Sequence, residues 1–166
     1  MSTQSTVLHT ILPVYNENSR VLILGSFPSV RSREVGFFYG HPQNRFWKTL
    51  AELFGESLPQ SIEEKRAFLL CHRIALWDVI ASCEIVGSSD ASIRNVRPND
   101  LSAVLKCAPI GAIFTNGKTA HRLYGRYLRG VTGRDAIALP STSPANAAWT
   151  QDRLNSAWSA LKDYLA

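Results

Sequence analysis

Three short apolar runs, each followed by a turn and then an amphipathic stretch, restrict this chain to a small set of folds. The runs are residues 21–24, 111–115 and 135–139. The first run is apolar without interruption, which is typical of a strand that is buried on both faces. Strands that alternate with helices form parallel sheets, so the sequence predicts an α/β fold with a mostly parallel sheet.

Helices are predicted between and after these strands. Apolar residues recur at helical spacing in residues 44–54, and further helices are expected at 61–71, 118–128 and 149–165. A shorter helix is expected to begin at a cap, Asn99 or Asp100, and to end at Ala108-Pro109. Residues 74–80 form a short apolar element. Residues 82–98 are polar without periodicity and are predicted to be a long loop.

The composition is that of a globular protein. The chain has 166 residues, of which 45% are hydrophobic and 19% are charged, and this length fits one domain. No apolar run approaches the roughly 20 residues of a membrane helix, and we expect no signal peptide. The three cysteines (Cys71, Cys83 and Cys107) lack metal-ligand spacing, so we expect reduced, buried thiols in a cytoplasmic protein.

The net charge of +5 permits a polyanionic partner without requiring one. The basic residues gather in two regions of the sequence, one around the aromatic segment 37–47 and one in the second half of the chain. They are Arg31, Arg33, Arg45 and Lys48 in the first region, and Lys118, Arg122, Arg126, Arg129 and Arg134 in the second.

Each predicted strand is followed by a loop of small and turn-forming residues, at 25–29, 116–118 and 140–146. Ligands of parallel sheets bind beyond the carboxyl ends of the strands, so we expect the three loops to converge on one site. Each loop can also be a plain turn. Residues 116–118 alternatively resemble a phosphate cradle at a helix N-terminus, and 140–146 a small-residue loop that packs against a nucleic-acid groove.

The aromatic segment 37–47, FFYGHPQNRFW, adds a platform near this edge of the sheet. Phe46 and Trp47 occupy adjacent helical positions with apolar followers, and we expect them in the core. Tyr39 lies outside any regular element and is the better candidate to stack against a flat, polar ligand such as a nucleobase.

Several chemistries lack their sequence patterns. The chain contains neither Gly-x-Gly-x-x-Gly nor Gly-x-x-x-x-Gly-Lys-Ser/Thr, which argues against a dinucleotide fold and against an NTPase. A Gly-x-Ser-x-Gly elbow for Ser/His/Asp catalysis is also missing. His41 and His121 have no Cys or His partner at ligand spacing, so we expect neither a metal nor another cofactor.

These motifs together resemble the uracil-DNA glycosylase superfamily. LILGSFPS stands where the family has its first motif, and ALPSTSPAN stands where it has its second. FFYGHPQNRFWK is similar to a segment of the mismatch-specific uracil glycosylases, and the longer pattern is most similar to the hypoxanthine-DNA (deoxyinosine) glycosylase branch. The resemblance implies a three-layer α/β/α sandwich with a short, mostly parallel central sheet, and a single glycosylase domain over residues 1–166.

The resemblance also assigns roles to individual residues. Asn44 would be catalytic, holding the attacking water or the base through its amide, although its position also fits a helix N-cap. The residues expected to bind the flipped base are Gly25, Ser26, Phe27, Pro28, Tyr39 and His41. The residues expected in the loop that enters the DNA groove are Ser141, Ser143, Pro144, Ala145 and Asn146. The residues expected to contact phosphates are Ser29, Arg31 and Lys118.

One departure from the superfamily pattern bears on the mechanism. Most members place Asp or Asn at the third residue of the first motif, where it positions water, and this chain has Phe27 there. Ser141 stands where the second motif usually has His or Asn. The hypoxanthine branch lacks these residues as well, so hypoxanthine excision in base excision repair is the expected function. Three alternatives remain open: a uracil or mismatch-specific glycosylase, a non-catalytic module that binds damaged DNA, and a hydrolase of free nucleosides.

The implied partner is double-stranded DNA that contains a deaminated base. We expect a monomeric enzyme without a cofactor and without a membrane partner. The motifs offer no lysine as a Schiff-base nucleophile, so a monofunctional glycosylase without strand cleavage is predicted.

Overall fold

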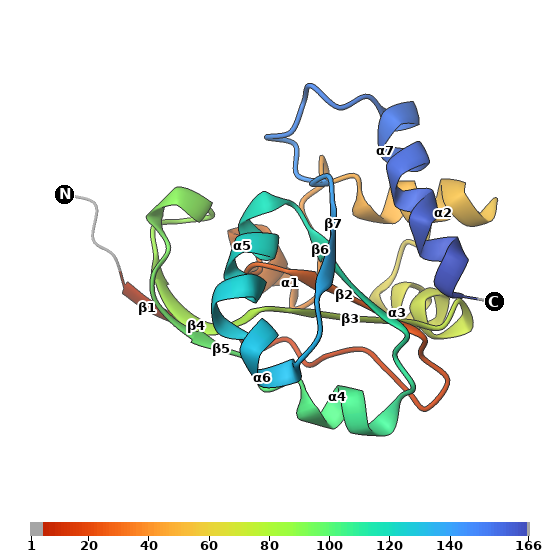
Figure 1. Ribbon diagram of the computed structural model, residues 1–166. Coiled ribbons are helices and arrows are strands. Elements are labelled where there is room, and N and C mark those ends of the chain that lie inside the picture. The colour runs from red at the N-terminus through yellow and green to blue at the C-terminus, as the bar shows by residue number, and fades with distance from the viewer. Residues whose placement is uncertain (1–4, 166) are drawn as a thin grey trace.

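The computed structural model, which describes residues 5–165, has a four-stranded parallel sheet at its centre (Figure 1). The strand order is β3 (Ile74–Asp78), β2 (Val21–Gly25), β6 (Ala112–Asn116) and β7 (Ala136–Leu139). All neighbouring strands in this sheet run parallel. The predicted parallel sheet is therefore confirmed, and each predicted strand lies within one residue of its observed bounds.

The two faces of the sheet build two separate cores, because alternate residues of a strand point to opposite faces. Val21 and Ile23 of β2 pack in one core with the helices α2 (Phe46–Phe54), α3 (Ile62–Cys71) and α7 (Gln151–Trp158). Leu22 and Leu24 pack in the other with α4 (Ser102–Cys107) and α5 (Lys118–Tyr127). Helices thus cover both faces of the sheet, as a three-layer α/β/α sandwich requires.

Side-chain caps and left-handed residues mark the ends of several helices. The Ser61 hydroxyl accepts the Glu64 N–H at the start of α3, and the Thr150 hydroxyl accepts the Arg153 N–H at the start of α7. Gly55 ends α2 in the left-handed conformation. The helix predicted over 149–165 is divided, because α7 ends at Trp158 and a 3₁₀ helix, η2 (Ser159–Tyr164), continues it. The short helices α1 (Val30–Val35) and α6 (Arg129–Thr132) were not predicted.

A second sheet corrects the prediction of a long loop over residues 82–98. The strands β1 (Ser5–Leu8), β4 (Ile80–Ile85) and β5 (Arg94–Pro98) form an antiparallel sheet with β4 in the middle. Ile80, Cys83 and Ile85 of β4 are buried although polar residues separate them. The mixed composition concealed this strand, and the loop shrinks to the segment between β4 and β5, which contains the 3₁₀ turn η1 (Asp90–Ser92).

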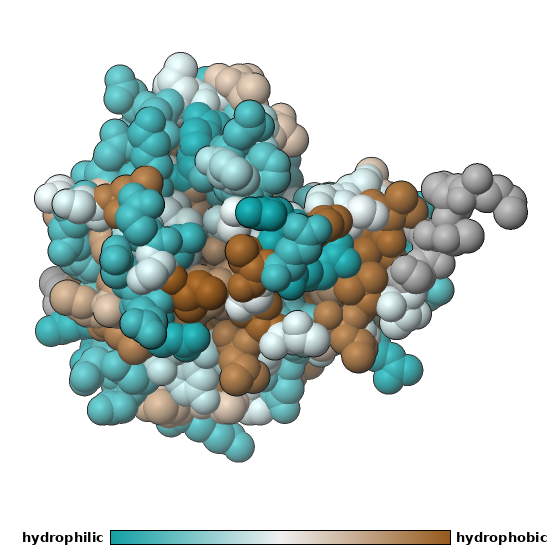
Figure 2. Space-filling view, turned by 180° about the vertical axis from the view of Figure 1, so that it is seen from behind, coloured by the Kyte–Doolittle hydropathy of each residue, from teal (hydrophilic) through white to brown (hydrophobic). Residues whose placement is uncertain are grey.

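The surface of this second sheet is partly apolar. Figure 2 shows apolar side chains gathered on the side of the molecule where the N-terminus and β1 lie, and Leu8 of β1 is exposed. Within the described residues, no helix is long and apolar enough to cross a membrane. All three cysteines are free thiols, but Cys71 and Cys107 are exposed, so only Cys83 fits the expected burial.

Candidate functional site

A cavity of about 420 Å³ opens at the carboxyl edge of the parallel sheet. The loops after β2, β6 and β7 all contribute to its wall, which confirms that they converge. The aromatic segment and the loop between β4 and β5 complete it. The lining residues are Gly25, Ser26, Phe27, Pro28, Ser29, Ser32, Phe38, Tyr39, His41, Asn44, Asp78, Ser88, Asp90, Asn116, Ser141, Thr142, Ser143, Pro144 and Ala145.

The loop after β2 brings Gly25 to Ser29 against the cavity. Phe27 is nearly buried, with its ring 6.0 Å from that of His9 in an edge contact and under the Arg33 guanidinium. Its hydrophobic contacts explain why an aromatic residue occupies this position. Ser29 caps α1, because its hydroxyl oxygen accepts the Ser32 N–H at 3.1 Å.

Tyr39 adopts a left-handed backbone conformation, with φ of 51°, between the aromatic pair and Gly40. Its ring stacks on Phe46 at a centroid distance of 4.1 Å. Its hydroxyl is buried and forms no hydrogen bond of standard geometry to a described residue, although the Asn116 amide lies close enough to it to lower its pKa. Burial, and next the Asp78 carboxylate, hold the pKa of this phenol well above its usual range. Phe46 and Trp47 are buried in the core as predicted.

Asn44 belongs to a hydrogen-bond network in which every donor is determined. Its Oδ1 accepts the Phe46 N–H and the Thr142 hydroxyl, each at 2.9 Å. The Thr142 oxygen in turn accepts from the Asn116 Nδ2 at 3.0 Å, while the Asn116 Oδ1 accepts the Thr142 N–H. Because the backbone N–H groups can only donate, both amides have one possible orientation.

Two consequences follow for Asn44. Asn44 stands one residue before Arg45, which is the N-cap of α2, so the predicted cap position is wrong by one residue; its Oδ1 nevertheless accepts the N–H of Phe46, the first residue of the helix. The amide oxygen is already shared by two donors, so the group that Asn44 has left to offer in the cavity is its NH₂, for which no hydrogen bond to a described residue is formed. The catalytic role of Asn44 stays a prediction. In this orientation Asn44 can act on a ligand only by donating a hydrogen bond from its NH₂ group.

The loop after β7 is held to the start of α2 by Arg45. The Arg45 guanidinium donates to the carbonyl oxygens of Trp149 and Asn146 at 2.6 and 3.1 Å, and the Arg45 N–H donates to the Thr142 carbonyl. Ser141, Ser143, Pro144 and Ala145 line the cavity as a result. Asn146 does not, because its amide turns inward and donates to the Ser141 carbonyl at 3.0 Å.

Gly117 allows the loops after β6 and β7 to approach each other. Its φ is 97°, and a Cβ at this position would stand 3.0 Å from the Ser141 Cβ. Lys118 begins α5 as an exposed residue, and Arg31 is exposed with an ion pair to Glu34 at 3.4 Å. Neither cation lines the cavity, so the phosphate contacts predicted for these two residues would have to form outside it, whereas Ser29, the third predicted contact, is one of the lining residues. His41 is also exposed, and its Nδ1 accepts the Gln43 N–H.

Two carboxylates of the cavity were not anticipated from the sequence. Asp78 is buried at the end of β3, and its position within the otherwise apolar run IALWDVI was the available signal. Asp90 reaches the cavity from η1, with Oδ1 3.3 Å from the Ser26 hydroxyl. Partial burial raises the pKa of Asp90, and the hydroxyls of Ser26 and Thr119 and the charge of Arg122 partly offset this effect.

The polar side chains that line the cavity are amides, hydroxyls, the His41 imidazole and two carboxylates. Among the described residues, no group of three or more His, Cys, Asp or Glu side chains could hold a metal ion. The chemistry that this set supports is recognition of a polar, neutral ligand through hydrogen bonds.

Comparison with known proteins gives consistent matches over most of the chain. The family model of the uracil DNA glycosylase superfamily matches residues 12–163. A hypoxanthine DNA glycosylase of Methanosarcina acetivorans is 38% identical over 150 residues, which cover 89% of this chain and 93% of that protein. A hypoxanthine DNA glycosylase of Methanosarcina barkeri is 36% identical over 137 residues, covering 81% and 85%.

A solved structure matches the fold as well. The solution NMR structure of a candidate uracil DNA glycosylase from Methanosarcina acetivorans superimposes with a TM-score of 0.79 at 34% sequence identity. The match covers 93% of this chain and 96% of that one.

Proposed function

Because the chain belongs to the uracil DNA glycosylase superfamily, we propose that it excises a deaminated base, hypoxanthine, from DNA in base excision repair. The reaction is hydrolysis of the N-glycosidic bond of deoxyinosine. The identity of 36–38% to two proteins named hypoxanthine DNA glycosylase supports the choice of base. The single structural observation that carries the proposal is the polar cavity at the sheet edge, with Asn44 in its wall.

A base inside a duplex cannot reach this cavity, so the nucleotide must first leave the stack. Extrusion costs a few kcal/mol and less for a weakened pair, which supplies part of the selectivity. Tyr39 is the side chain proposed to lie against the flipped base, with the loop at Gly25, Ser26, Phe27 and Pro28 on its edges and His41 at the mouth. Base–aromatic stacking contributes about 1–3 kcal/mol.

The orientation of Asn44 supports a role in stabilising the departing base. Its NH₂ is the free half of the amide, and a purine that leaves as an anion gains hydrogen-bonding strength at its ring nitrogens and carbonyl oxygen. Placed dipoles that strengthen as charge develops favour a dissociative, oxocarbenium-like path. The lining residues include no lysine, in agreement with a monofunctional enzyme that leaves the strand uncut.

The proposed DNA contacts surround the cavity. Ser143, Pro144 and Ala145 would enter the groove and fill the space that the base vacates, while Ser29, Arg31 and Lys118 would meet phosphates. Asn146 would stabilise this loop from inside, through the hydrogen bond that its side-chain amide donates to the Ser141 carbonyl. We propose that residues 1–166 form one glycosylase domain that acts on double-stranded DNA as a monomer in the cytoplasm.

The test is base release by the purified protein from otherwise identical duplexes that carry inosine, uracil, xanthine or ethenoadenine. We expect inosine to be the preferred substrate, and Asn44→Ala to lower its single-turnover rate by about 10²-fold or more. Asn18→Ala is the matched control, because Asn18 is exposed on a turn outside the cavity.

The other outcomes identify the alternatives. Dominant release of uracil would contradict the choice of hypoxanthine. Binding without release of any base would contradict catalysis and favour the non-catalytic module. Turnover of free inosine would favour a nucleoside hydrolase, and strand scission at the abasic product would contradict a monofunctional enzyme.

A further inference from the structure

The second group of basic residues in the sequence forms a row along one helix face. The sequence has no Asp or Glu from 101 to 134. The exposed cations that α5 and α6 contribute in this segment, which we call the basic row, are Lys118, Arg122, Arg126 and Arg129. They follow one another at intervals of four, four and three residues, a spacing that places side chains on one face of a helix. The proposed function uses only the first of them.

The basic row leads away from the cavity. α5 begins directly after β6, at the carboxyl edge of the parallel sheet, and α6 is followed by β7, which starts at the amino edge because it runs parallel to β6. The two helices therefore cross from one edge of the sheet to the other, as Figure 1 shows. At about 1.5 Å per residue, Arg126 lies ~12 Å and Arg129 ~16 Å along this path from Lys118.

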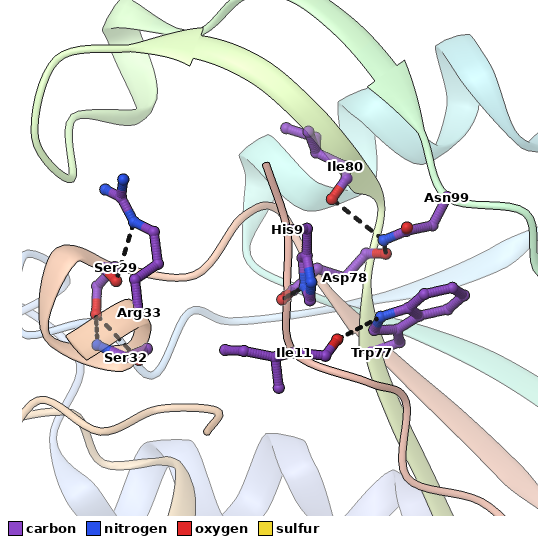
Figure 3. Close-up of polar contacts among 9 residues, drawn as sticks. All are labelled: His9, Ile11, Ser29, Ser32, Arg33, Trp77, Asp78, Ile80 and Asn99. Carbon is purple, nitrogen blue, oxygen red and sulfur yellow. Dashed lines mark hydrogen bonds and ion pairs between the residues drawn. The ribbon is translucent and has the colours of Figure 1, made fainter. Parts of the chain in front are cut away.

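The carboxylates around the cavity oppose only the near end of the row. Figure 3 shows Asp78 beside His9, whose Nε2 lies 2.8 Å from the Asp78 Oδ2, at the end of β3. Burial raises the pKa of the Asp90 carboxyl, and the nearby charge of Arg122 partly offsets this effect. Both acids thus stand at the carboxyl edge, where the row begins.

At the far end, two guanidinium groups are held in place and keep donors available. Arg126 lies over the Tyr127 ring, 5.2 Å from its centroid, and forms no ion pair with a described residue. Arg129 donates from its Nε to Asp135, and its terminal nitrogens form no hydrogen bond to a described residue. Planar guanidinium groups with available N–H donors match the oxygens of a phosphate.

The turn that carries Arg129 is anchored from the core. The buried Tyr124 hydroxyl donates to the Arg134 carbonyl at 2.7 Å, and its oxygen lies 2.8 Å from the Thr132 hydroxyl. The far end of the row therefore has a defined position before any ligand arrives.

A hollow of about 500 Å³ opens beside these two arginines. Its other lining residues are Gly125, Gly130, Gly133 and Asp135. A Cβ built on any of the three glycines would meet no atom within 4 Å. The helix surface is thus bare at this point, and a bulky anionic chain such as a sugar–phosphate backbone can approach it closely.

We propose that Arg122, Arg126 and Arg129 form a second DNA-binding surface, which holds the backbone of an undamaged duplex segment while the cavity holds the flipped base of another. The proposal rests on the proposed function, because it takes DNA as the polyanion. A duplex whose base enters the cavity lies across the carboxyl edge of the sheet and meets only the start of the row. DNA is stiff, with a persistence length of about 50 nm, so the same duplex resists turning down the side of the molecule. A second segment reaches the row without bending.

The first test looks for a ternary complex. The protein is loaded with one equivalent of a short, unlabelled duplex that carries a tetrahydrofuran abasic site, well above its dissociation constant. A fluorescein-labelled undamaged duplex is then titrated in and followed by anisotropy. We expect it to bind, with a slope of about −3 in a plot of log K against log salt, because each of three phosphate contacts contributes about −0.9. Failure of the loaded protein to bind the labelled duplex would overturn the proposal.

Variants separate charge, shape and fold. Arg126→Gln/Arg129→Gln should weaken binding of the labelled duplex at least about 10-fold and reduce the magnitude of the slope by about 2, with hypoxanthine release unchanged. Gly125→Gln fills the hollow without a change of charge and should also weaken this binding. Its melting temperature should not fall, because glycine is unfavourable inside a helix. Lys48→Gln/Arg66→Gln removes the same charge from exposed positions of α2 and α3, on the other face of the sheet, and should change nothing.

A kinetic test asks whether the surface passes the protein between DNA segments. The dissociation rate of a labelled tetrahydrofuran duplex should rise with the concentration of undamaged competitor duplex, because the competitor binds before the first duplex leaves. In Arg126→Gln/Arg129→Gln the rate should not depend on the competitor. A rate independent of the competitor in the wild-type protein would contradict a second surface.

The outcomes separate this inference from the function on which it rests. If the wild-type protein neither binds the tetrahydrofuran duplex nor releases hypoxanthine, the proposed function itself fails. If it does both and the loaded protein binds no second duplex, only the second surface is refuted. Equal weakening of the first duplex in Arg126→Gln/Arg129→Gln would assign the row to the duplex in the cavity and would also overturn the proposal.

Discussion

At the scale of single residues, Thr142 controls what Asn44 can do. It is completely buried, and its hydroxyl accepts from the Asn116 Nδ2 while donating to the Asn44 Oδ1. This hydroxyl has one proton, and the bond from Asn116 forces that proton toward Asn44. The Thr142 hydroxyl and the Phe46 N–H thus hold the Asn44 Oδ1 together and leave the Asn44 NH₂ to the cavity.

Replacing Thr142 by valine should affect both stability and base release. The substitution leaves the Asn116 Nδ2 without a partner, which costs about 1–3 kcal/mol of unfolding free energy. It also removes one of the two donors that hold the Asn44 Oδ1, so we expect hypoxanthine release to slow at least about 10-fold. Urea unfolding and single-turnover rates measure the two effects.

Thr49→Val is the matched control for this substitution. Thr49 is also completely buried and accepts from the Gln151 Nε2 at 2.9 Å, but it does not line the cavity. It should lose a similar amount of stability and keep its activity. Equal activity of both variants would contradict the role of Thr142.

The residues that sequence reasoning found and missed differ in a physical way. Gly25, Asn44 and Ser141 stand in or directly beside turns whose composition is visible locally, and all three line the cavity. Asp78 was missed because its place in the cavity wall depends on which strand lies beside β2. A sequence without its strand order does not reveal that pairing, although a carboxylate inside an apolar run is an unusual feature that marks the position.

At the scale of elements, the loop after β7 and helix α2 form one unit through Arg45. This arginine was grouped with the basic residues that could meet a polyanion. Its guanidinium instead bonds two backbone carbonyls of residues 146–149, 101 and 104 positions away in sequence. The loop proposed to enter the DNA groove is thus pre-positioned by the same segment that carries Asn44.

Arg45→Met should loosen this loop. The variant keeps much of the side-chain length and loses the charged hydrogen bonds, so we expect the unfolding free energy to fall by about 1–3 kcal/mol. Hydrogen–deuterium exchange should increase in the peptide that covers residues 141–149, with slower base release. Lys48→Met, on an exposed position of the same helix, should change none of these quantities. Unchanged exchange in Arg45→Met would show that other contacts hold the loop.

The elements of the parallel sheet were predictable and those of the antiparallel sheet were not, for a reason of burial. The central strand β2 is completely buried over residues 21–24. Strands that are buried on both faces can be recognised in a sequence because their residues form a continuous apolar run. In β5 four of the five residues are exposed, and β4 alternates only irregularly because its pairing with β5 contains register shifts. Local composition therefore indicated a loop where tertiary pairing forms a hairpin.

At the scale of the whole molecule, the polar cavity and the net charge of +5 are proposed to bind different parts of one substrate, the base and the DNA backbone. The cavity itself offers two carboxylates and no arginine or lysine among its lining residues, so it favours a neutral base over a phosphate. The cations that could meet the DNA backbone, such as Arg31 and Lys118, lie on α1 and α5, outside the lining. Affinity for DNA and selection of the base are then separable properties.

This separation predicts a specific salt dependence. The affinity for a duplex with a tetrahydrofuran site should fall linearly in a plot of log K against log salt, because each phosphate contact releases counterions. Arg31→Ala and Lys118→Ala should each reduce the magnitude of the slope by about 1. Neither should change the single-turnover rate of hypoxanthine release at saturating protein, since neither cation lines the cavity.

Lys106→Ala is the control for charge alone. Lys106 is exposed on α4, which lies at the opposite end of the molecule from the loop between β7 and α7 (Figure 1). A general effect of net charge would lower the slope in all three variants equally, whereas phosphate contacts around the cavity lower it only in the first two. Slopes that do not change in Arg31→Ala and Lys118→Ala would place the DNA on another face and leave the cavity without its proposed access to a flipped base.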